Sequence, residues 1–137
     1  MTSQRIYRLT RYGNLLVLKA AAGGRDGTVR QFTLLVDTRS SYTVLRANVL
    51  ENLGCDLQNP NRRIRTSTGG GIVEAPMVTV PWFSCLGQRV ENFPIVAYTL
   101  PATTFVDGLL GMDFLTLCQA VIPVEEAEIR IRQSTEE

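Results

Sequence analysis

The strongest constraint on the fold is a series of short apolar segments that are separated by turns. Asn14 to Ala22 is apolar, a turn containing three glycines follows at residues 23–27, and Thr28 to Asp37 resumes as a second apolar run. Short apolar runs bounded by such turns are typical of strands, and two consecutive runs predict a β-hairpin. The chain is therefore expected to be all-β, as a small barrel or a sandwich.

A second hairpin is predicted farther along the chain, with a tip made of glycine. Arg62 to Thr68 and Ile72 to Pro81 form its arms, and Gly69, Gly70 and Gly71 lie between them. Glycine adopts backbone conformations that other residues rarely reach. The tip therefore suits either a mobile lid or only a tight turn.

Two short helices are expected between the strands. Arg46 to Leu53 carries apolar residues at helical spacing, and Gly54 follows it as a stop signal. Leu109 to Leu117 is a second apolar helix candidate. Strands are also predicted on both sides of a turn at Gly87-Gln88, within Trp82 to Val90. The remaining strands are predicted at Phe93 to Leu100, Ala120 to Pro123 and Ala127 to Arg132. The last residues, Gln133 to Glu137, are expected to be frayed.

Length and charge narrow the class of protein. The 137 residues suit one domain, taken as residues 1–137, and the net charge is only +1. Broad nucleic-acid binding needs a basic surface that releases counterions, so nucleic acid is not an expected partner. No stretch approaches the ~20 apolar residues that span a bilayer. We therefore expect no membrane partner and a cytoplasmic protein.

The residue types that are missing limit the possible chemistry. The chain has no histidine, which removes Ser-His-Asp and Cys-His hydrolases and His-ligated zinc. Its one lysine, Lys19, lies in a predicted strand, which disfavours a Ser-Lys dyad. The three cysteines are odd in number and widely spaced, as expected for reduced, packed thiols. If the protein is a hydrolase, carboxylates are the natural candidates to activate water, without a metal or another cofactor.

Three segments contain the candidates for this chemistry. In Leu34 to Ser41 a buried strand ends in Asp37, followed by small hydroxyl residues; taken alone, this aspartate caps a turn. In Phe105 to Leu115 two bulky apolar residues precede Gly111, which is typical of a strand packed closely on a helix. The third segment is the hairpin tip.

The order and spacing of these segments resemble the retropepsin-like (retroviral-type) aspartic protease family, including its bacterial members. In that family a strand ends in two hydrophobic residues followed by an aspartate. The next three positions are threonine or serine, then glycine, then alanine or serine. A flap hairpin follows, and then two hydrophobic residues, a glycine and a short helix. The similar residues here are Leu35 to Ser40 with Tyr42 to Leu45 after them, the hairpin from about Arg65 to Pro76, and Leu109 to Leu115.

The resemblance covers about Asn14 to Arg132 and implies a particular architecture. The expected fold is a small closed acid-protease-type barrel with a flap hairpin and one or two short helices, with one lobe per chain. Such a lobe contains half of an active site.

The resemblance also implies a mechanism that needs two aspartates. The two carboxylates share one proton; the ionised one takes a proton from water, and the protonated one polarises the scissile carbonyl. This chain has one such motif, because Asp107 lacks the Thr or Ser and Gly that should follow and is interpreted as a turn residue. The implied enzyme is a homodimer in which each subunit supplies Asp37. Thr38 would brace the pair across the axis, and Ala127 to Arg132 could pair across the interface.

A peptide or protein substrate is implied as well. The residues that the resemblance assigns to substrate binding follow the aspartate, form the hairpin tip or precede the second helix. They are Arg39, Ser40, Thr68, Gly69, Gly70, Gly71, Leu109, Leu110 and Gly111.

Arg39 departs from the family, which has glycine at this position. Arginine adds bulk and positive charge, and it either faces the carboxylate or turns outward to an acidic residue such as Glu51 or Asp56. Two functions follow: an aspartic endopeptidase, or a catalytically silent retropepsin-fold dimer that acts as a peptide-binding or interaction module. A monomeric β-barrel with an unrelated binding function is a third interpretation, which leaves the order of the motifs unexplained.

Overall fold

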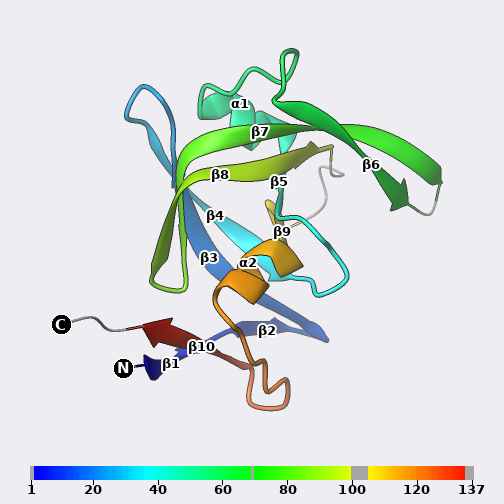
Figure 1. The fold of residues 1–137 in the computed structure, drawn as a ribbon. Coiled ribbons are helices and arrows are strands. Elements are labelled where there is room, and N and C mark those ends of the chain that lie inside the picture. The colour runs from blue at the N-terminus through cyan, green and yellow to red at the C-terminus, as the bar shows by residue number, and fades with distance from the viewer. Residues whose placement is uncertain (1, 69, 100–104, 135–137) are drawn as a thin grey trace.

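The computed structural model describes residues 2–68, 70–99 and 105–134, and within them the fold is mostly β with two short helices (Figure 1). The strands are β1 (Thr2–Arg8), β2 (Thr10–Tyr12), β3 (Leu15–Gly23), β4 (Val29–Val36), β5 (Val44–Arg46), β6 (Arg62–Thr68), β7 (Gly71–Cys85), β8 (Gln88–Tyr98), β9 (Gly108–Leu110) and β10 (Glu128–Ser134), and the helices are α1 (Ala47–Asn52) and α2 (Met112–Leu117). The expectation of a β-rich chain with short helices is confirmed.

Most of these strands belong to one sheet that folds back on itself. Its order is β2-β3-β4-β9-β5-β8-β7-β6, and β3 pairs additionally with β7. Pairing therefore runs in a ring from β3 through β4, β9, β5, β8 and β7 back to β3. Strands β1 and β10 form a separate antiparallel pair at the end of the molecule where both termini lie (Figure 1).

Strand β9 determines the geometry of the candidate site, because it lies between two other strands. It runs parallel to β4 and antiparallel to β5. Position 108 needs glycine, because a Cβ atom there would collide with the backbone of Val44. The prediction of one helix over Leu109 to Leu117 is wrong in its first residues, since the strand pairing extends through Leu110 and helix α2 begins at Met112.

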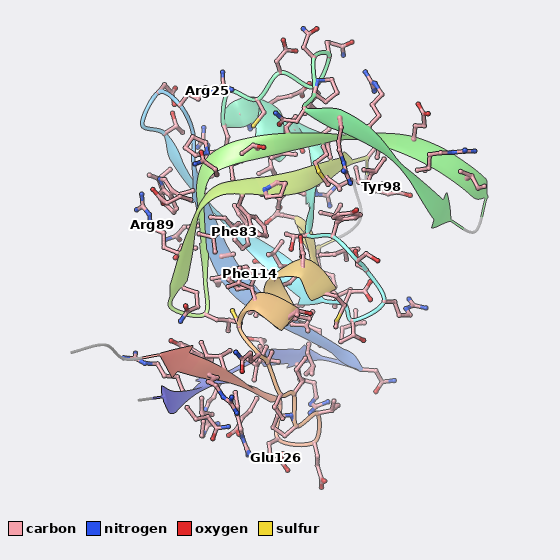
Figure 2. All side chains as sticks on the ribbon, viewed as in Figure 1. Arg25, Phe83, Arg89, Tyr98, Phe114 and Glu126 are labelled. Atoms are coloured by element: carbon pink, nitrogen blue, oxygen red, sulfur yellow. The ribbon has the colours of Figure 1, made fainter. Side chains whose placement is uncertain are left out.

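Aromatic side chains from the sheet and from α2 fill the main core. The ring of Phe83 in β7 stacks on Phe93 in β8, with centroids 4.8 Å apart, and meets Phe114 of α2 edge-on at 5.2 Å. Figure 2 shows Phe83 and Phe114 together near the middle of the molecule. Aromatic pairs of this kind add about 0.5–1.5 kcal/mol beyond the burial of their area. The core therefore fixes α2 against the sheet.

The predicted second hairpin consists of β6 and the first half of β7, and it projects from the body of the molecule in Figure 1. A small hydrophobic cluster joins its base to the segment that follows β4. The cluster contains Ile64, Ala75, Met77 and Val96, with Tyr42 and Val44 packed against it. Gly69, at the tip, lies outside the described residues.

The strand boundaries near the middle of the chain differ slightly from those predicted. The turn between β7 and β8 is at Leu86-Gly87, one residue earlier than expected, and Leu86 adopts a positive φ of 54° there. The strand expected up to Val90 after this turn and the strand expected from Phe93 form one strand, β8, which pairs with β7 from Gln88 to Val96. Leu100, the expected last residue of that strand, lies outside the described residues.

The C-terminal region differs more. Val121 forms only an isolated bridge with Arg130, in place of a strand over Ala120 to Pro123. Gln133 and Ser134 were expected to be frayed, but their backbone pairs with β1. Residues 135–137 lie outside the described part of the chain. In the part of the chain that the structure describes, no helix combines the length and the apolar character needed to cross a membrane.

Candidate active site

Asp37 lies where two parallel strands end. Strand β4 ends at Val36 with Leu110, the last residue of β9, opposite it, and the Asp37 amide donates to the Leu110 carbonyl oxygen at 3.0 Å. The backbone then turns, and the Ser40 amide donates to the Asp37 carbonyl oxygen at 3.2 Å. The ring of the sheet thus fixes the backbone that carries the carboxylate.

One oxygen of the Asp37 carboxylate is held and the other is open. The backbone amide of Arg39 donates to Oδ1 at 2.9 Å, and no hydrogen bond from the described residues reaches Oδ2. A hydrogen bond to an ionised carboxylate is short and strong, so it orients the group. The Asp37 side chain is 19% exposed, so the carboxyl group is partly accessible from solvent.

Arginine at position 39 fits the backbone of this turn. The described non-glycine residues with a positive φ are Leu86, Asn92, Gln119 and Ala127, and Arg39 is not one of them. An L-residue with a negative φ needs no glycine. The hydrogen bond to Asp37 also comes from the main chain and does not depend on the residue type at position 39.

The Arg39 side chain points to solvent, with 93% of its surface exposed. Its Nε atom lies 3.8 Å from Oδ1 of Asp37. The expected alternatives were a guanidinium that faces the carboxylate or one that pairs outward with Glu51 or Asp56. The structure combines the two: the side chain is outward, but its ion pair is with Asp37. Such exposed pairs are typically worth about 0–1 kcal/mol.

The neighbours of Asp37 in the motif have different surroundings. Thr38 is exposed in the single chain. Ser40 is half-buried, and its hydroxyl donates to the carbonyl oxygen of Tyr42 at 2.6 Å. The Ser40 hydroxyl therefore closes the turn that contains Asp37.

The Leu109-Leu110-Gly111 segment supports this turn. Leu110 is fully buried and Leu109 is half-buried, so only Leu109 has side-chain surface to offer a ligand. A Cβ atom at Gly111 would collide with the backbone of Tyr42, so glycine allows the turn to pack directly on the start of α2. Leu110 and Gly111 thus hold the turn in the single chain.

Asp107 has a structural role that agrees with its interpretation as a turn residue. Its Oδ2 accepts the Thr33 amide at 2.8 Å, and its own amide donates to the Thr33 carbonyl oxygen at 2.8 Å. These bonds join the start of β9 to the middle of β4. The carboxylate of Asp107 therefore fixes the strand pair at a point before the chain reaches Asp37.

Two residues that hold the turn, Thr43 and Asp113, were not predicted from the sequence. Thr43 is fully buried, and both its amide and its hydroxyl donate to the Asp113 carboxylate. Asp113 follows Gly111 by two residues, so its position next to the apolar-apolar-glycine segment was the available signal.

The projecting hairpin contacts the same turn. Arg62 of β6 donates from Nη2 to the Tyr42 hydroxyl at 3.1 Å. At the other end of the hairpin, Thr68 pairs with Gly71. The expected substrate-binding residues near the tip thus lie on an arm whose base is attached to the segment after Asp37.

The cysteines and carboxylates show no metal centre in the described chain. Cys55, Cys85 and Cys118 are free thiols, as the sequence predicted. Within residues 2–68, 70–99 and 105–134, no group of three His, Cys, Asp or Glu side chains is placed to bind a metal ion.

Comparisons with known proteins agree with this geometry. The sequence profile of the aspartyl protease family matches residues 20–114, which include Asp37, the hairpin and the start of α2. A similar solved structure is a retropepsin-like aspartic protease from Rickettsia conorii, with a TM-score of 0.62 and 17% sequence identity, covering 96% of this chain and 93% of that one. No curated protein sequence gives a significant match. The chain therefore belongs to the aspartyl protease family and has the retropepsin-like fold.

Proposed function

We propose that the protein is an aspartic endopeptidase that acts as a homodimer, with one Asp37 carboxylate from each subunit. The observation that carries this proposal is the Asp37 carboxylate itself, which accepts a backbone amide at Oδ1 and has no hydrogen bond at Oδ2 from the residues that the structure describes. Within one chain, Asp107 and Asp113 use their carboxylates for hydrogen bonds to backbone amides. The second catalytic carboxylate is therefore assigned to a second copy, related by a two-fold axis.

In the proposed reaction the two carboxylates hold one proton and one water between them. The ionised carboxylate takes a proton from the water, whose oxygen attacks the carbonyl carbon of the peptide bond. The protonated carboxylate gives its proton to the carbonyl oxygen, and a tetrahedral diol forms. When this intermediate collapses, the carboxyl group that took the water's proton gives it to the amide nitrogen, and the C–N bond breaks. A hydroxyl of the diol returns its proton to the other carboxylate, so the pair again holds one proton. Thr38, which is exposed in the single chain, is assigned to the contact between subunits.

The hairpin of β6 and β7 is proposed as the flap that covers an extended peptide. In an antiparallel pair, directly opposite residues share a face. Arg62 and Ile64 therefore share a face with their partners Met77 and Ala75, and this face packs towards Tyr42 and Val44. Thr68, Gly70 and Gly71 would then contact the peptide backbone from the tip.

A second candidate function is favoured by one observation, the exposed guanidinium of Arg39 beside the carboxylate. A retropepsin-fold dimer without catalytic activity could use this charge to bind peptides. The two candidates agree on the dimer and differ in whether a bound peptide is cleaved.

The test is cleavage of a diverse peptide library by the purified protein, with products identified by mass spectrometry at several pH values. The proposal predicts cleavage, inhibition by a pepstatin-type transition-state analogue and no effect of metal chelators. Asp37→Asn should abolish cleavage while keeping the fold. Asp26→Asn is the matched control, because Asp26 caps an exposed turn by accepting the Thr28 amide at 2.9 Å. Absence of cleavage by a correctly formed wild-type dimer at every pH would favour the silent binding module.

A further inference from the structure

The turn that carries Asp37 is held from behind by a second aspartate, Asp113, in the first turn of α2. Oδ2 of Asp113 accepts the Thr43 amide at 2.9 Å, and Oδ1 accepts the Thr43 hydroxyl at 2.8 Å. Oδ1 also accepts the amide of Phe114 at 2.7 Å. Both oxygens of this carboxylate are therefore used in hydrogen bonds within the protein.

Thr43 connects this carboxylate to the segment beside Asp37. It is fully buried, and its hydroxyl accepts the Gly111 amide at 3.3 Å while donating to Asp113. A buried polar network of this kind is stabilising when every member has a partner and costly when one member loses it. Thr43 and Asp113 thus form a clasp between the end of the Asp37 turn and the start of α2.

Backbone hydrogen bonds continue the clasp towards Asp37. The Met112 amide donates to the Ser40 carbonyl oxygen at 2.7 Å, and the Asp113 amide donates to the Ser41 carbonyl oxygen at 3.2 Å. These bonds need the start of α2 to face the turn in one orientation, which the Asp113 carboxylate fixes through Thr43. Helix α2 is itself fixed by Phe114 in the aromatic core.

We infer that Asp113 is a positioning residue for catalysis, which acts on the Asp37 carboxylate through Thr43 and the turn between them. This inference rests on the proposed peptidase function. The two carboxylates of a dyad must lie within hydrogen-bond distance of one water, and small displacements of reacting groups lower rates strongly. Asp113 provides the rigid support that keeps Oδ2 of Asp37 in that place.

Asp113→Asn tests the clasp, because an amide has one acceptor oxygen where the carboxylate has two. If the amide oxygen faces Thr43 Oγ1 and the Phe114 amide, the NH₂ group faces the Thr43 amide. If the side chain is reversed, the NH₂ group faces the Phe114 amide. In either orientation one backbone N–H loses its acceptor.

The matched control is Asp107→Asn. Asp107 also accepts a backbone amide across the sheet, from Thr33, at a part-buried position. Its contact lies four residues before Asp37 in β4 and outside the clasp. Asparagine at position 107 can keep the bond from the Thr33 amide through its amide oxygen, so this variant controls for the loss of a negative charge outside the clasp.

The measurement compares kcat and KM of the wild type and both variants at equal concentrations of folded dimer. Asp113→Asn should lower kcat at least about tenfold, with KM changed less than about threefold, while Asp107→Asn keeps kcat within about threefold. Thr43→Val should reproduce the loss, and Thr43→Ser, which keeps the hydroxyl, should restore most of kcat. Equal kcat losses in Asp113→Asn and Asp107→Asn would overturn the inference.

A second readout separates this inference from the proposed function. Amide hydrogen exchange across residues 38–43 should be faster by at least about tenfold in Asp113→Asn than in the wild type, and unchanged in Asp107→Asn. If the wild-type protein cleaves no peptide, the peptidase proposal fails and the exchange result alone decides whether the clasp holds the turn. Unchanged exchange at residues 38–43 would show that Asp113 does not position it.

Discussion

The carboxylate of Asp37 depends on the backbone around it more than on the side chain that replaces the family's glycine. Arg39 contributes its amide to Asp37 Oδ1, and glycine would contribute the same amide. The guanidinium is almost fully exposed, where water screens its charge. The departure from the family at this position therefore affects the surface of the site and leaves its hydrogen bonds unchanged.

Arg39→Gly should accordingly change kcat/KM less than about fivefold over a pH series, which corresponds to the ~1 kcal/mol upper range of an exposed ion pair. Arg39→Pro is the contrasting variant, since proline removes the amide donor to Asp37. A hydrogen bond to a charged group is worth about 1.5–3 kcal/mol, so Arg39→Pro should lower kcat/KM at least about tenfold. An Arg39→Gly protein that is much faster than the wild type would show that the guanidinium obstructs catalysis.

The buried thiols should make stability depend on alkaline pH. Burial, with a smaller contribution from nearby Cys118, raises the pKa of Cys85 from 9.0 to about 12, and burial raises the pKa of Cys118 to about 11. Because the folded pKa is the higher one, the stabilisation from the neutral Cys85 thiol is complete below pH 9 and is lost between pH 9 and 12. Each proton contributes a slope of about 1.4 kcal/mol per pH unit.

Cys85→Ala should therefore show a shallower fall in the free energy of unfolding between pH 9 and 11 than the wild type. Urea unfolding at a series of pH values measures both slopes. Identical slopes in the two proteins would mean that Cys85 stays protonated in the unfolded chain or ionises in the folded one.

At the scale of elements, the long strands and the hairpins could be predicted, because apolar patterns and turn residues determine them locally. Strand β9 could not be predicted, because its sequence, Gly-Leu-Leu, closely precedes a helix and is compatible with the first turn of that helix. Their strand conformation comes from pairing with β4 and β5, which are distant in sequence. The Thr43–Asp113 contact was missed for the same reason, because it joins residues 70 positions apart.

The attachment of the hairpin to the Asp37 turn gives a prediction at this scale. Tyr42→Phe removes the hydroxyl that accepts the hydrogen bond from Arg62, but it keeps the ring in its hydrophobic cluster. The hairpin base is then held less firmly, so KM should rise about two- to fivefold while the thermal midpoint changes little. Arg62→Met should act similarly, and the double variant should be no worse than either single one, as expected for two groups in one interaction. Additive effects on KM would show that the two residues act separately.

At the scale of the whole molecule, the termini pair within their own chain. All of β1 pairs with β10, and the β10 residues Ile129 and Ile131 are fully buried in the main core. The sequence predicted a strand at Ala127 to Arg132 but not its partner. The same residues would form the antiparallel pair whether the partner strand came from the same chain or from a second subunit. Removing β10 would expose this part of the core and destabilise the folded chain. Loss of the dimer in a truncated protein would therefore report on folding as well as on pairing between subunits.

We propose a shared active site, which takes one Asp37 from each of two chains. It is tested by mixing wild-type protein with the Asp37→Asn variant at constant total concentration, allowing subunits to exchange and measuring the rate of peptide cleavage. The variant is labelled with ¹⁵N, because the substitution itself hardly changes the mass, and native mass spectrometry of the mixture then confirms that mixed dimers have formed. If both carboxylates are required, activity should follow the square of the wild-type fraction, and an equal mixture should retain about one quarter of the activity. Retention of about one half in an equal mixture that contains mixed dimers would mean that each chain works alone, and it would contradict the shared site.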